Sequence, residues 1–145
     1  MKIDRLGLAV LAVLSVALPG KAAAPERPFK IVVNPTNRVA SVSRSDLNDI
    51  YLGKKTEWDG GLLIQPVDQL ESATVRAAFV QTVHGKTVSE IRQYWEKELA
   101  IGTKRPPLHK SEDDMLTYVK VHAGAIGYVA SETDVGKLRV VPVGS

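Results

Sequence analysis

Apolar residues beyond position 24 follow two patterns: short dense runs, or recurrence every three to four residues. Residues 29–33 form a run rich in branched side chains that stops at Asn34 and Pro35, which predicts a buried strand. Pro66 has no amide hydrogen, so we expect the end of the strand around it to lie off the central ladder of a sheet. Three later apolar runs predict strands at residues 62–67, 125–129 and 138–143, and the first of them contains Pro66.

Helical spacing in four segments predicts helices that begin near residues 43, 74, 88 and 111. Ser43 and Ser111 are suited to cap two of these helices, because an aspartate follows each of them three positions later. Glycines follow the periodic stretches and predict where the helices end, at Gly53, Gly85, Gly102 and Gly124. The helical side chains predicted to face a core are Leu47, Ile50, Tyr51, Val75, Ala78, Phe79, Val83, Val88, Ile91, Trp95, Leu99, Met115, Leu116 and Val119.

The predicted order of elements is β-α-β-α-α-α-β-β, with an irregular loop at residues 103–109. Strands separated by helices favour a parallel or mixed sheet against which the helices pack, so we predict an α/β fold. The sequence shows no internal repeat and no interdomain linker. A segment as long as 25–145 can bury enough surface for one stable core, and we predict a single domain over these residues.

Residues 1–24 have the order of regions that is typical of a secretory signal peptide. Lys2 and Arg5 precede an uncharged run at residues 6–18 that consists almost entirely of Leu, Ala and Val. Small residues follow and end at Ala24. A membrane-spanning helix needs about 20 apolar residues, so this run is too short to be one. We expect cleavage after Ala24 and export to the periplasm.

The charge of the chain argues against a nucleic-acid partner. The formal net charge is +3, of which residues 1–24 contribute +2 through three basic residues and one aspartate, leaving +1 for residues 25–145. Nucleic-acid-binding domains usually concentrate basic residues on one surface. The chain also contains no cysteine. That absence excludes disulfides, thiolate metal sites and the cysteine-linked lipid anchor of bacterial lipoproteins.

Residues 68–74 are the most suggestive place for a ligand, because they join a predicted strand to a predicted helix. Backbone N–H groups and the positive end of the helix dipole favour an anion at such a helix start. Ser72 and Thr74 add hydroxyl donors, and a basic residue lies in the first turn. The candidate anion-binding residues are therefore Ser72, Ala73, Thr74 and Arg76.

The same residues allow a simpler interpretation. Ser72 or Thr74 can act only as the N-cap of the helix, a role that stabilises a helix by about 1 kcal/mol. Two carboxylates, Asp68 and Glu71, are close in sequence and would repel an anion. The residues alone leave both interpretations open.

Motifs for catalysis or for metal binding are missing from the sequence. It contains neither a G-x-S-x-G nucleophile elbow nor a glycine-rich phosphate loop of the Walker type. His84, His109 and His122 do not have the i, i+4 spacing of a helical metal site, and we expect them to be structural or solvated. We therefore predict no enzymatic activity, no catalytic residue, no metal site and no cofactor.

Three segments, taken in order, resemble a known family. Residues 50–54 read Ile-Tyr-Leu-Gly-Lys and precede Trp58, residues 64–79 include Ser-Ala-Thr at a helix start, and residues 124–128 read Gly-Ala-Ile-Gly-Tyr. They are similar to the I-F-L-G-K…W segment, the S-G-T segment and the G-A-I-G-Y strand of phosphate-binding proteins of ABC importers. The chain thus resembles the PstS-like family of periplasmic binding proteins.

The resemblance implies a type II periplasmic-binding-protein-like fold, with a mixed sheet flanked by helices, and a phosphate-like anion at the helix start. Full phosphate-binding proteins hold phosphate between two lobes, whereas this chain has the length of a single lobe. It departs from the family motif in two places: Ala73 replaces the glycine of S-G-T, and Asp68 stands where the family has an arginine. The added Cβ of Ala73 narrows the approach of a ligand to the backbone. Asp68 places a negative charge where an anion would meet a positive one in the family.

Two functions are consistent with these features. The first is a periplasmic substrate-binding-like protein that binds phosphate or another small oxyanion weakly, either as a monomer or as a homodimer that closes a cleft. The alternative is an accessory module of the cell envelope that keeps the fold, has lost ligand binding and contacts another envelope protein. Asp68 and Ala73 favour the alternative.

Overall fold

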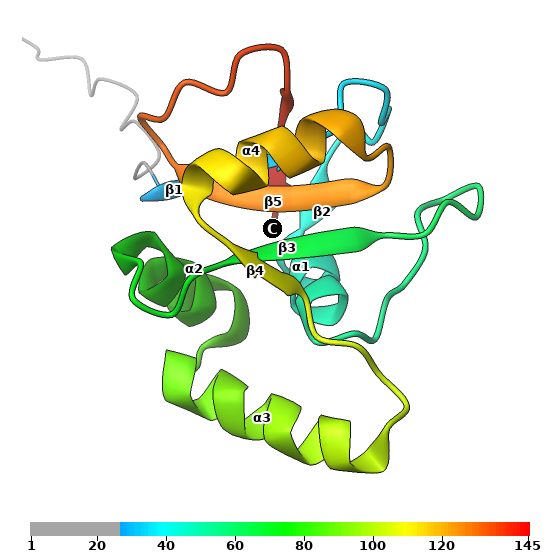
Figure 1. Ribbon diagram of the computed structural model, residues 1–145. Helices are drawn as coiled ribbons and strands as arrows, with labels where there is room; N and C mark the ends of the chain where they lie inside the picture. Colours follow the sequence, from blue (N-terminus) through cyan, green and yellow to red (C-terminus); the bar gives the residue numbers. More distant parts are fainter. Residues whose placement is uncertain (1–26) are drawn as a thin grey trace, which may run out of the picture.

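The computed structural model describes residues 27–145, so the predicted signal peptide lies outside the described residues. Four helices and seven strands follow one another in this part of the chain (Figure 1). They are β1 (Phe29–Val33), β2 (Val42–Ser43), α1 (Arg44–Tyr51), β3 (Gln65–Gln69), α2 (Thr74–His84), α3 (Val88–Ile101), β4 (Leu108–Lys110), α4 (Glu112–Val121), β5 (Ala125–Ala130), β6 (Arg139–Val141) and β7 (Val143–Gly144). None of the helices within residues 27–145 combines the length and the apolar character needed to cross a membrane.

The main sheet has five strands in the order β4-β3-β5-β1-β6. β3 is parallel to both β4 and β5, whereas β1 is antiparallel to β5 and β6. A second, two-stranded parallel sheet joins β2 to β7. The sheet is therefore mixed, as predicted, because helices connect the parallel strands while β1 lies between two strands from the C-terminal part of the chain.

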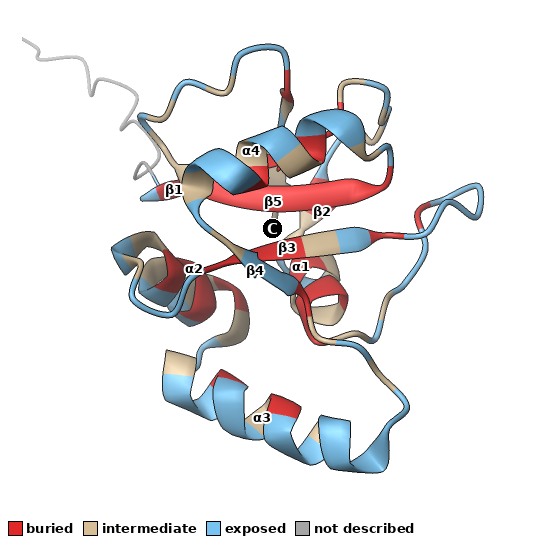
Figure 2. Ribbon diagram, viewed as in Figure 1, coloured by how far each residue is buried: buried red, intermediate tan, exposed pale blue. Residues whose placement is uncertain are grey.

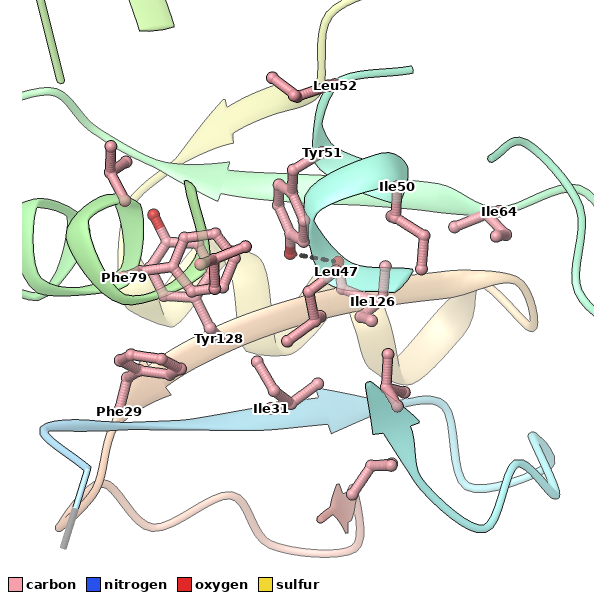
Figure 3. Packing of buried hydrophobic residues seen from close by; sticks show 14 of the residues in the cluster. Phe29, Ile31, Leu47, Ile50, Tyr51, Leu52, Ile64, Phe79, Ile126 and Tyr128 are labelled. Carbon is pink, nitrogen blue, oxygen red and sulfur yellow. Dashed lines mark hydrogen bonds between the residues drawn. The ribbon is translucent and has the colours of Figure 1, made fainter. Parts of the chain in front are cut away.

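Helices cover both faces of the sheet. The larger hydrophobic cluster joins α1, α2 and the inner face of α3 to β1 and β5, and its labelled residues are shown in Figure 3. The smaller cluster lies under α4, where Met115 and Val119 pack on Val67 and Val129. Figure 2 shows α4 with a buried underside and α3 with only a narrow buried stripe. The core thus holds β5 rigidly from both sides.

Aromatic rings fill the centre of the larger cluster. Tyr128 stacks on Phe79 with ring centroids 3.8 Å apart, and Tyr51 meets Phe79 edge-on at 4.8 Å. The Tyr51 hydroxyl donates to the Val67 carbonyl at 3.0 Å. Burial, with the nearby charge of Asp68, raises the pKa of Tyr51 well above its ordinary value. Both tyrosines belong to the segments that carry the family resemblance, and here they connect α1 and β5 to β3.

Most predicted helix ends are confirmed by the structure. Ser43 and Ser111 accept hydrogen bonds from the amides of Asp46 and Asp114, as N-caps do. Gly85 and Gly102 end α2 and α3 in the left-handed region that glycine adopts without strain. The fourth helix ends earlier than predicted, at Val121, and Gly124 instead lies beside the turn that precedes β3.

Four features of the strands differ from the prediction. β2 and β4 were not predicted, β3 begins at Gln65 rather than at residue 62, and Pro142 divides the last strand into β6 and β7. β3 is an interior strand, and its end around Pro66, which we expected to lie off the central ladder, pairs with β5 alone. Pro66 is tolerated there because β4 pairs with β3 only from Val67 onward.

The burial of three aromatic or apolar side chains bears on the prediction. Trp58, part of the first segment that resembles the family, is buried and donates from Nε1 to the Gly124 carbonyl at 3.0 Å. Trp95 is buried as predicted, but Leu99 is 56% exposed. Leu99 was predicted to face the core, and that prediction is wrong because α3 packs mainly against α2 and reaches the cluster only from Val88 to Trp95.

His84 is half-buried in its neutral form at the end of α2. Its Nδ1 lies 2.8 Å from Oδ1 of Asn48. An amide oxygen only accepts hydrogen bonds, so Nδ1 carries the proton. Burial, with the positive charge of Lys86, lowers the pKa of His84 to about 4.

His84→Gln is expected to make the protein less sensitive to mild acid. His84 binds a proton near pH 6.5 in the unfolded chain and near pH 4 in the folded protein. Neutral His84 therefore contributes fully to the free energy of unfolding above pH 6.5, and this contribution is lost as pH falls toward 4. Between pH 7 and pH 5 the unsubstituted protein should lose about 2 kcal/mol more unfolding free energy than the variant. Urea unfolding at both pH values measures this difference, and equal losses would contradict it.

Candidate functional site

The predicted anion site lies where β3 ends and α2 begins, beside β4. Ala73 occupies the N-cap position of α2 and provides no side-chain hydrogen bond. Ser72 and Thr74 are exposed on either side of it. The interpretation of Ser72 or Thr74 as the N-cap is therefore wrong. The first turn of α2 also contains no acidic residue, so its positive end faces solvent without a side-chain cap.

Arg76 does not extend into solvent from the first turn of α2. Its side chain is 6% exposed, and its Nε lies 3.6 Å from Oδ1 of Asp68. Nε has no hydrogen-bond partner in the described part of the chain. Three of the predicted site residues therefore remain at the surface, while Arg76 is turned inward. Asp68, which the sequence suggested would repel an anion, instead has its charge offset by Arg76.

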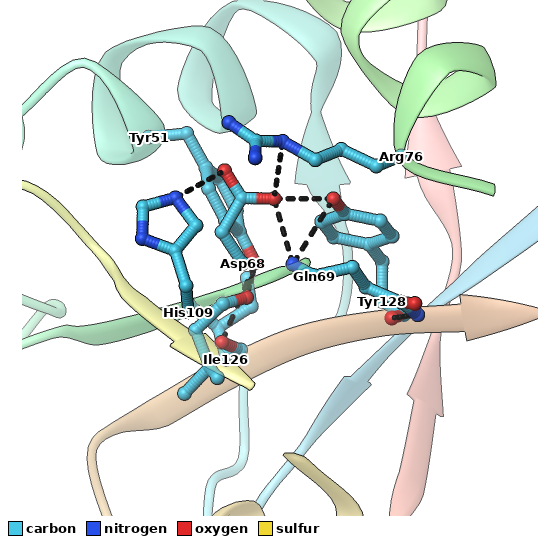
Figure 4. Close-up of polar contacts among 8 residues, drawn as sticks. Tyr51, Asp68, Gln69, Arg76, His109, Ile126 and Tyr128 are labelled. Atoms are coloured by element: carbon cyan, nitrogen blue, oxygen red, sulfur yellow. Dashed lines mark hydrogen bonds and ion pairs between the residues drawn. The ribbon is translucent and has the colours of Figure 1, made fainter. Parts of the chain in front are cut away.

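Asp68 is the centre of a buried polar cluster, drawn in Figure 4. Its Oδ1 accepts hydrogen bonds from the Tyr128 hydroxyl and, at 2.8 Å, from the Gln69 amide. Its Oδ2 lies 3.8 Å from Nε2 of His109, a half-exposed residue of β4. Burial, together with the charge of Asp68, raises the pKa of Tyr128 far above its ordinary value. Tyr128 therefore stays protonated and acts as a donor to the carboxylate.

A second polar contact fixes the same end of β3 from the opposite side. Gln69 donates from Nε2 to the Tyr128 carbonyl at 2.9 Å and to Oε2 of Glu112 at 3.2 Å. Burial disfavours the Glu112 carboxylate, but hydrogen bonds from Thr133, the Ala130 amide and Gln69 outweigh it and keep its pKa below the ordinary value. These bonds hold β3, β5 and the start of α4 in register, so the cluster around Asp68 is rigid.

A groove of about 390 Å³ opens beside Arg76. One wall is a single face of α3, and the facing wall comes from the segments before α2 and β4. Ser72, Ala73 and Thr74 are not among the residues that line it. The lining residues, called the α3 groove below, are Leu70, Glu71, Arg76, Arg92, Trp95, Glu96, Leu99, Pro106 and His109.

Sequence reasoning missed the partners of Arg76. His109 was expected to be structural or solvated; it is half-exposed, lines the α3 groove and faces Asp68. Arg92, which pairs with Glu71 across the groove, was not singled out. Tyr128 was noted only as part of the Gly-Ala-Ile-Gly-Tyr segment. Asp68 and Tyr128 lie 60 residues apart, so no local pattern could have joined them.

Comparisons with known proteins identify the fold. No family model matches the sequence, and no curated protein matches it either. Among solved structures, the chain is similar to a Clostridium perfringens protein described as a phosphate ABC transporter substrate-binding protein with bound phosphate, at 20% identity and a TM-score of 0.63. That match covers 80% of this chain and 44% of the other.

Two further solved structures agree. An ABC-type phosphate transport receptor from Vibrio cholerae matches at 21% identity and a TM-score of 0.61, over 80% of this chain and 46% of that one. PstS from Borrelia burgdorferi matches at 14% identity and a TM-score of 0.63, over 81% and 47%. The predicted PstS-like α/β fold, with a mixed sheet flanked by helices, is confirmed. The chain spans less than half of the length of these structures.

Proposed function

We propose that this protein is a non-enzymatic, periplasmic substrate-binding-like protein that binds phosphate or another small oxyanion weakly at the start of α2. The observation that carries the proposal is the uncapped first turn of α2, which has no acidic residue and no side-chain hydrogen bond at its N-cap. The similar solved proteins with phosphate in their names support the class of ligand.

The geometry offers an anion several donors. The N–H groups of Thr74 and Val75 and the helix dipole attract negative charge, whereas the Ala73 and Arg76 amides already donate to the Leu70 and Ala73 carbonyls. The exposed hydroxyls of Ser72 and Thr74 are beside them. Arg76 belongs to the same first turn, and its inward-pointing side chain adds positive potential behind the site, although Asp68 offsets part of it. We assign Ser72, Ala73, Thr74 and Arg76 to the site, with backbone groups and hydroxyls as donors and Arg76 as a charge behind them.

The affinity is expected to be low. An exposed helix start holds its ligand in water, where hydrogen bonds and charges contribute little. The chain also spans less than half of the phosphate-binding structures that it resembles, so a second surface is not supplied by the described residues. A second copy of the chain or another envelope protein could cover the site and raise the affinity. The signal-peptide pattern of residues 1–24 supports the periplasmic location.

Titration calorimetry with phosphate and with sulfate tests the proposal. We expect dissociation constants near the millimolar range, and a loss of about tenfold in affinity for Ser72→Ala because one hydrogen bond to a charged ligand is removed. Ser45→Ala, an equally exposed serine in α1, is the matched control and should bind as the unsubstituted protein does.

The absence of any heat at millimolar phosphate and sulfate would contradict the proposal. It would favour the alternative, an accessory module of the envelope that has kept the fold and lost the ligand. The observation in favour of that alternative is the buried contact between Arg76 and Asp68, because Arg76 is then occupied within the protein.

A further inference from the structure

The α3 groove has a chemical character that differs from that of the exposed helix start. Arg92, Trp95, Glu96 and Leu99 follow the i, i+3, i+4, i+7 spacing, so one face of α3 forms its wall. The charged residues of this face alternate with apolar ones. The groove therefore combines an apolar surface with a small number of polar groups, which is typical of a site for a small organic molecule.

The guanidinium of Arg76 is the buried polar group at this groove. It lines the groove, yet its side chain is only 6% exposed. Its approach to Asp68 through Nε, at 3.6 Å, is too long for a hydrogen bond, and Nε has no other partner in the described residues. A guanidinium carries five N–H donors in a planar fork. A buried polar atom without a hydrogen bond is costly, and the surrounding apolar groups weaken competition from water, so an acceptor that reaches the guanidinium from the groove gains more than one at the surface.

The apolar residues of the groove wall are partly open to solvent. Leu70 is 46% exposed and Leu99 is 56% exposed, although both are large hydrophobic residues. Trp95 and Pro106 also line the groove. The Leu99 side chain, wrongly predicted to be in the core, is thus available to a ligand. Covering such side chains is favourable by about 25 cal/mol per Å² of apolar surface.

The charges around the groove disfavour a ligand that carries two negative charges. Asp68 faces Arg76, and Glu71 pairs with Arg92, so these four charges offset one another. Glu96 adds a negative charge at the rim, and His109 adds a positive one only when protonated. A doubly charged anion such as phosphate at neutral pH would meet no net positive charge here. A carboxylate matches the planar guanidinium with a single charge.

We propose that the α3 groove binds an organic monocarboxylate with an apolar body, with the carboxylate on Arg76 and the body against Leu70, Trp95 and Leu99. This site goes beyond the proposed phosphate site: the two share Arg76 but differ in their other residues and in their ligand, and either can fail without the other. The apolar body accounts for the exposed leucines, and the carboxylate supplies the acceptor that Arg76 lacks.

Three probes separate the two halves of the ligand: phenylacetate, acetate as the head alone, and benzyl alcohol as the apolar body alone. Binding of each is followed by two-dimensional NMR, with the Trp95 indole as reporter. We expect phenylacetate to bind at least tenfold more tightly than either partial probe. Leu99→Asn should weaken phenylacetate at least fivefold. Ile101→Asn, an equally exposed apolar residue of α3 that does not line the groove, should leave it unchanged.

Arg76→Met completes the test if circular dichroism shows that the variant folds, and it should reduce phenylacetate binding to the level of benzyl alcohol. Phenylacetate that binds no more tightly than acetate would overturn the inference. Equal effects of Leu99→Asn and Ile101→Asn would overturn it as well. Phosphate titration is read separately, at the Ser72 and Thr74 amides, so a failure of this inference is distinguished from a failure of the phosphate site.

Discussion

Gly124→Ala is expected to lower the free energy of unfolding by about 3 kcal/mol or more. A Cβ at this position would lie 2.0 Å from the Leu63 carbonyl oxygen and 3.2 Å from its carbon. The obstacle is backbone, and hydrogen bonds on both sides hold it in place: Trp58 N donates to the Leu62 carbonyl and Ile64 N to the Thr56 carbonyl, both at 2.8 Å. The turn before β3 therefore cannot move aside at low cost.

The same substitution would also disturb two hydrogen bonds. The Gly124 carbonyl accepts from the Trp58 indole at 3.0 Å and from the Gln65 amide at 2.9 Å. Urea unfolding followed by circular dichroism measures the effect. Two glycines serve as controls. Gly144→Ala should be nearly neutral because nothing lies within 4 Å, and Gly127→Ala should cost about 1 to 2 kcal/mol because the flexible Met115 side chain can move. A Gly124 variant as stable as the Gly144 variant would contradict this account of the turn.

Asp68→Asn is the second substitution with a large expected effect, a loss of about 3 kcal/mol of unfolding free energy. It removes the carboxylate that faces Arg76, and a buried guanidinium is left without a counter-charge. It also changes the acceptor of the Tyr128 hydroxyl, whose raised pKa keeps it a donor. The shape of the side chain is preserved, so the loss reports on charge rather than on packing.

A double-mutant cycle isolates the contact between Asp68 and Arg76. Arg76→Met removes the buried charge and keeps much of the apolar volume. Asp68→Asn combined with Arg76→Met should be at least about 1.5 kcal/mol more stable than the sum of the single losses predicts. If the loss of unfolding free energy in the double variant equals the sum of the two single losses, Arg76 and Asp68 do not compensate each other.

The helices could be predicted from the sequence because their signals are local. Ser43 and Ser111 cap α1 and α4 through amides only three residues away, and Gly85 and Gly102 adopt the left-handed conformation at the residue where the helix stops. Each signal requires no knowledge of the rest of the chain. The strand β1 was predicted for a similar reason, since its residues are buried on both faces and read as one apolar run.

The short strands could not be predicted, because pairing rather than composition defines them. β4 has three largely exposed residues and follows two prolines, and it is a strand only because it pairs with β3. The apolar residues 62–64 were assigned to a strand, yet Leu63 forms a single bridge with Glu57 and the strand begins at Gln65. Leu99 has helical spacing with Trp95, but α3 is long enough to extend past the core.

The candidate site was predicted in part. The helix start at Thr74 and its exposed hydroxyl residues follow from the strand-to-helix pattern, which is local. The orientation of Arg76 does not follow from a local pattern, because it depends on the Asp68 carboxylate, which is itself held by Tyr128 from β5. Asp68 was therefore assessed as a lone repelling charge. A buried cluster of this kind becomes visible only when the sheet has brought β3, β4 and β5 together.

Amide chemical shifts under phosphate titration test the central claim, an oxyanion at the start of α2, most directly. Two-dimensional ¹⁵N–¹H spectra are recorded with phosphate up to about 20 mM at constant pH and ionic strength. The account predicts progressive shifts of the Ala73, Thr74 and Val75 amides, with those of Ser45 and Asp46 at the capped start of α1 unchanged. Unchanged amides at residues 73–75, or equal shifts at the starts of α1 and α2, would contradict it.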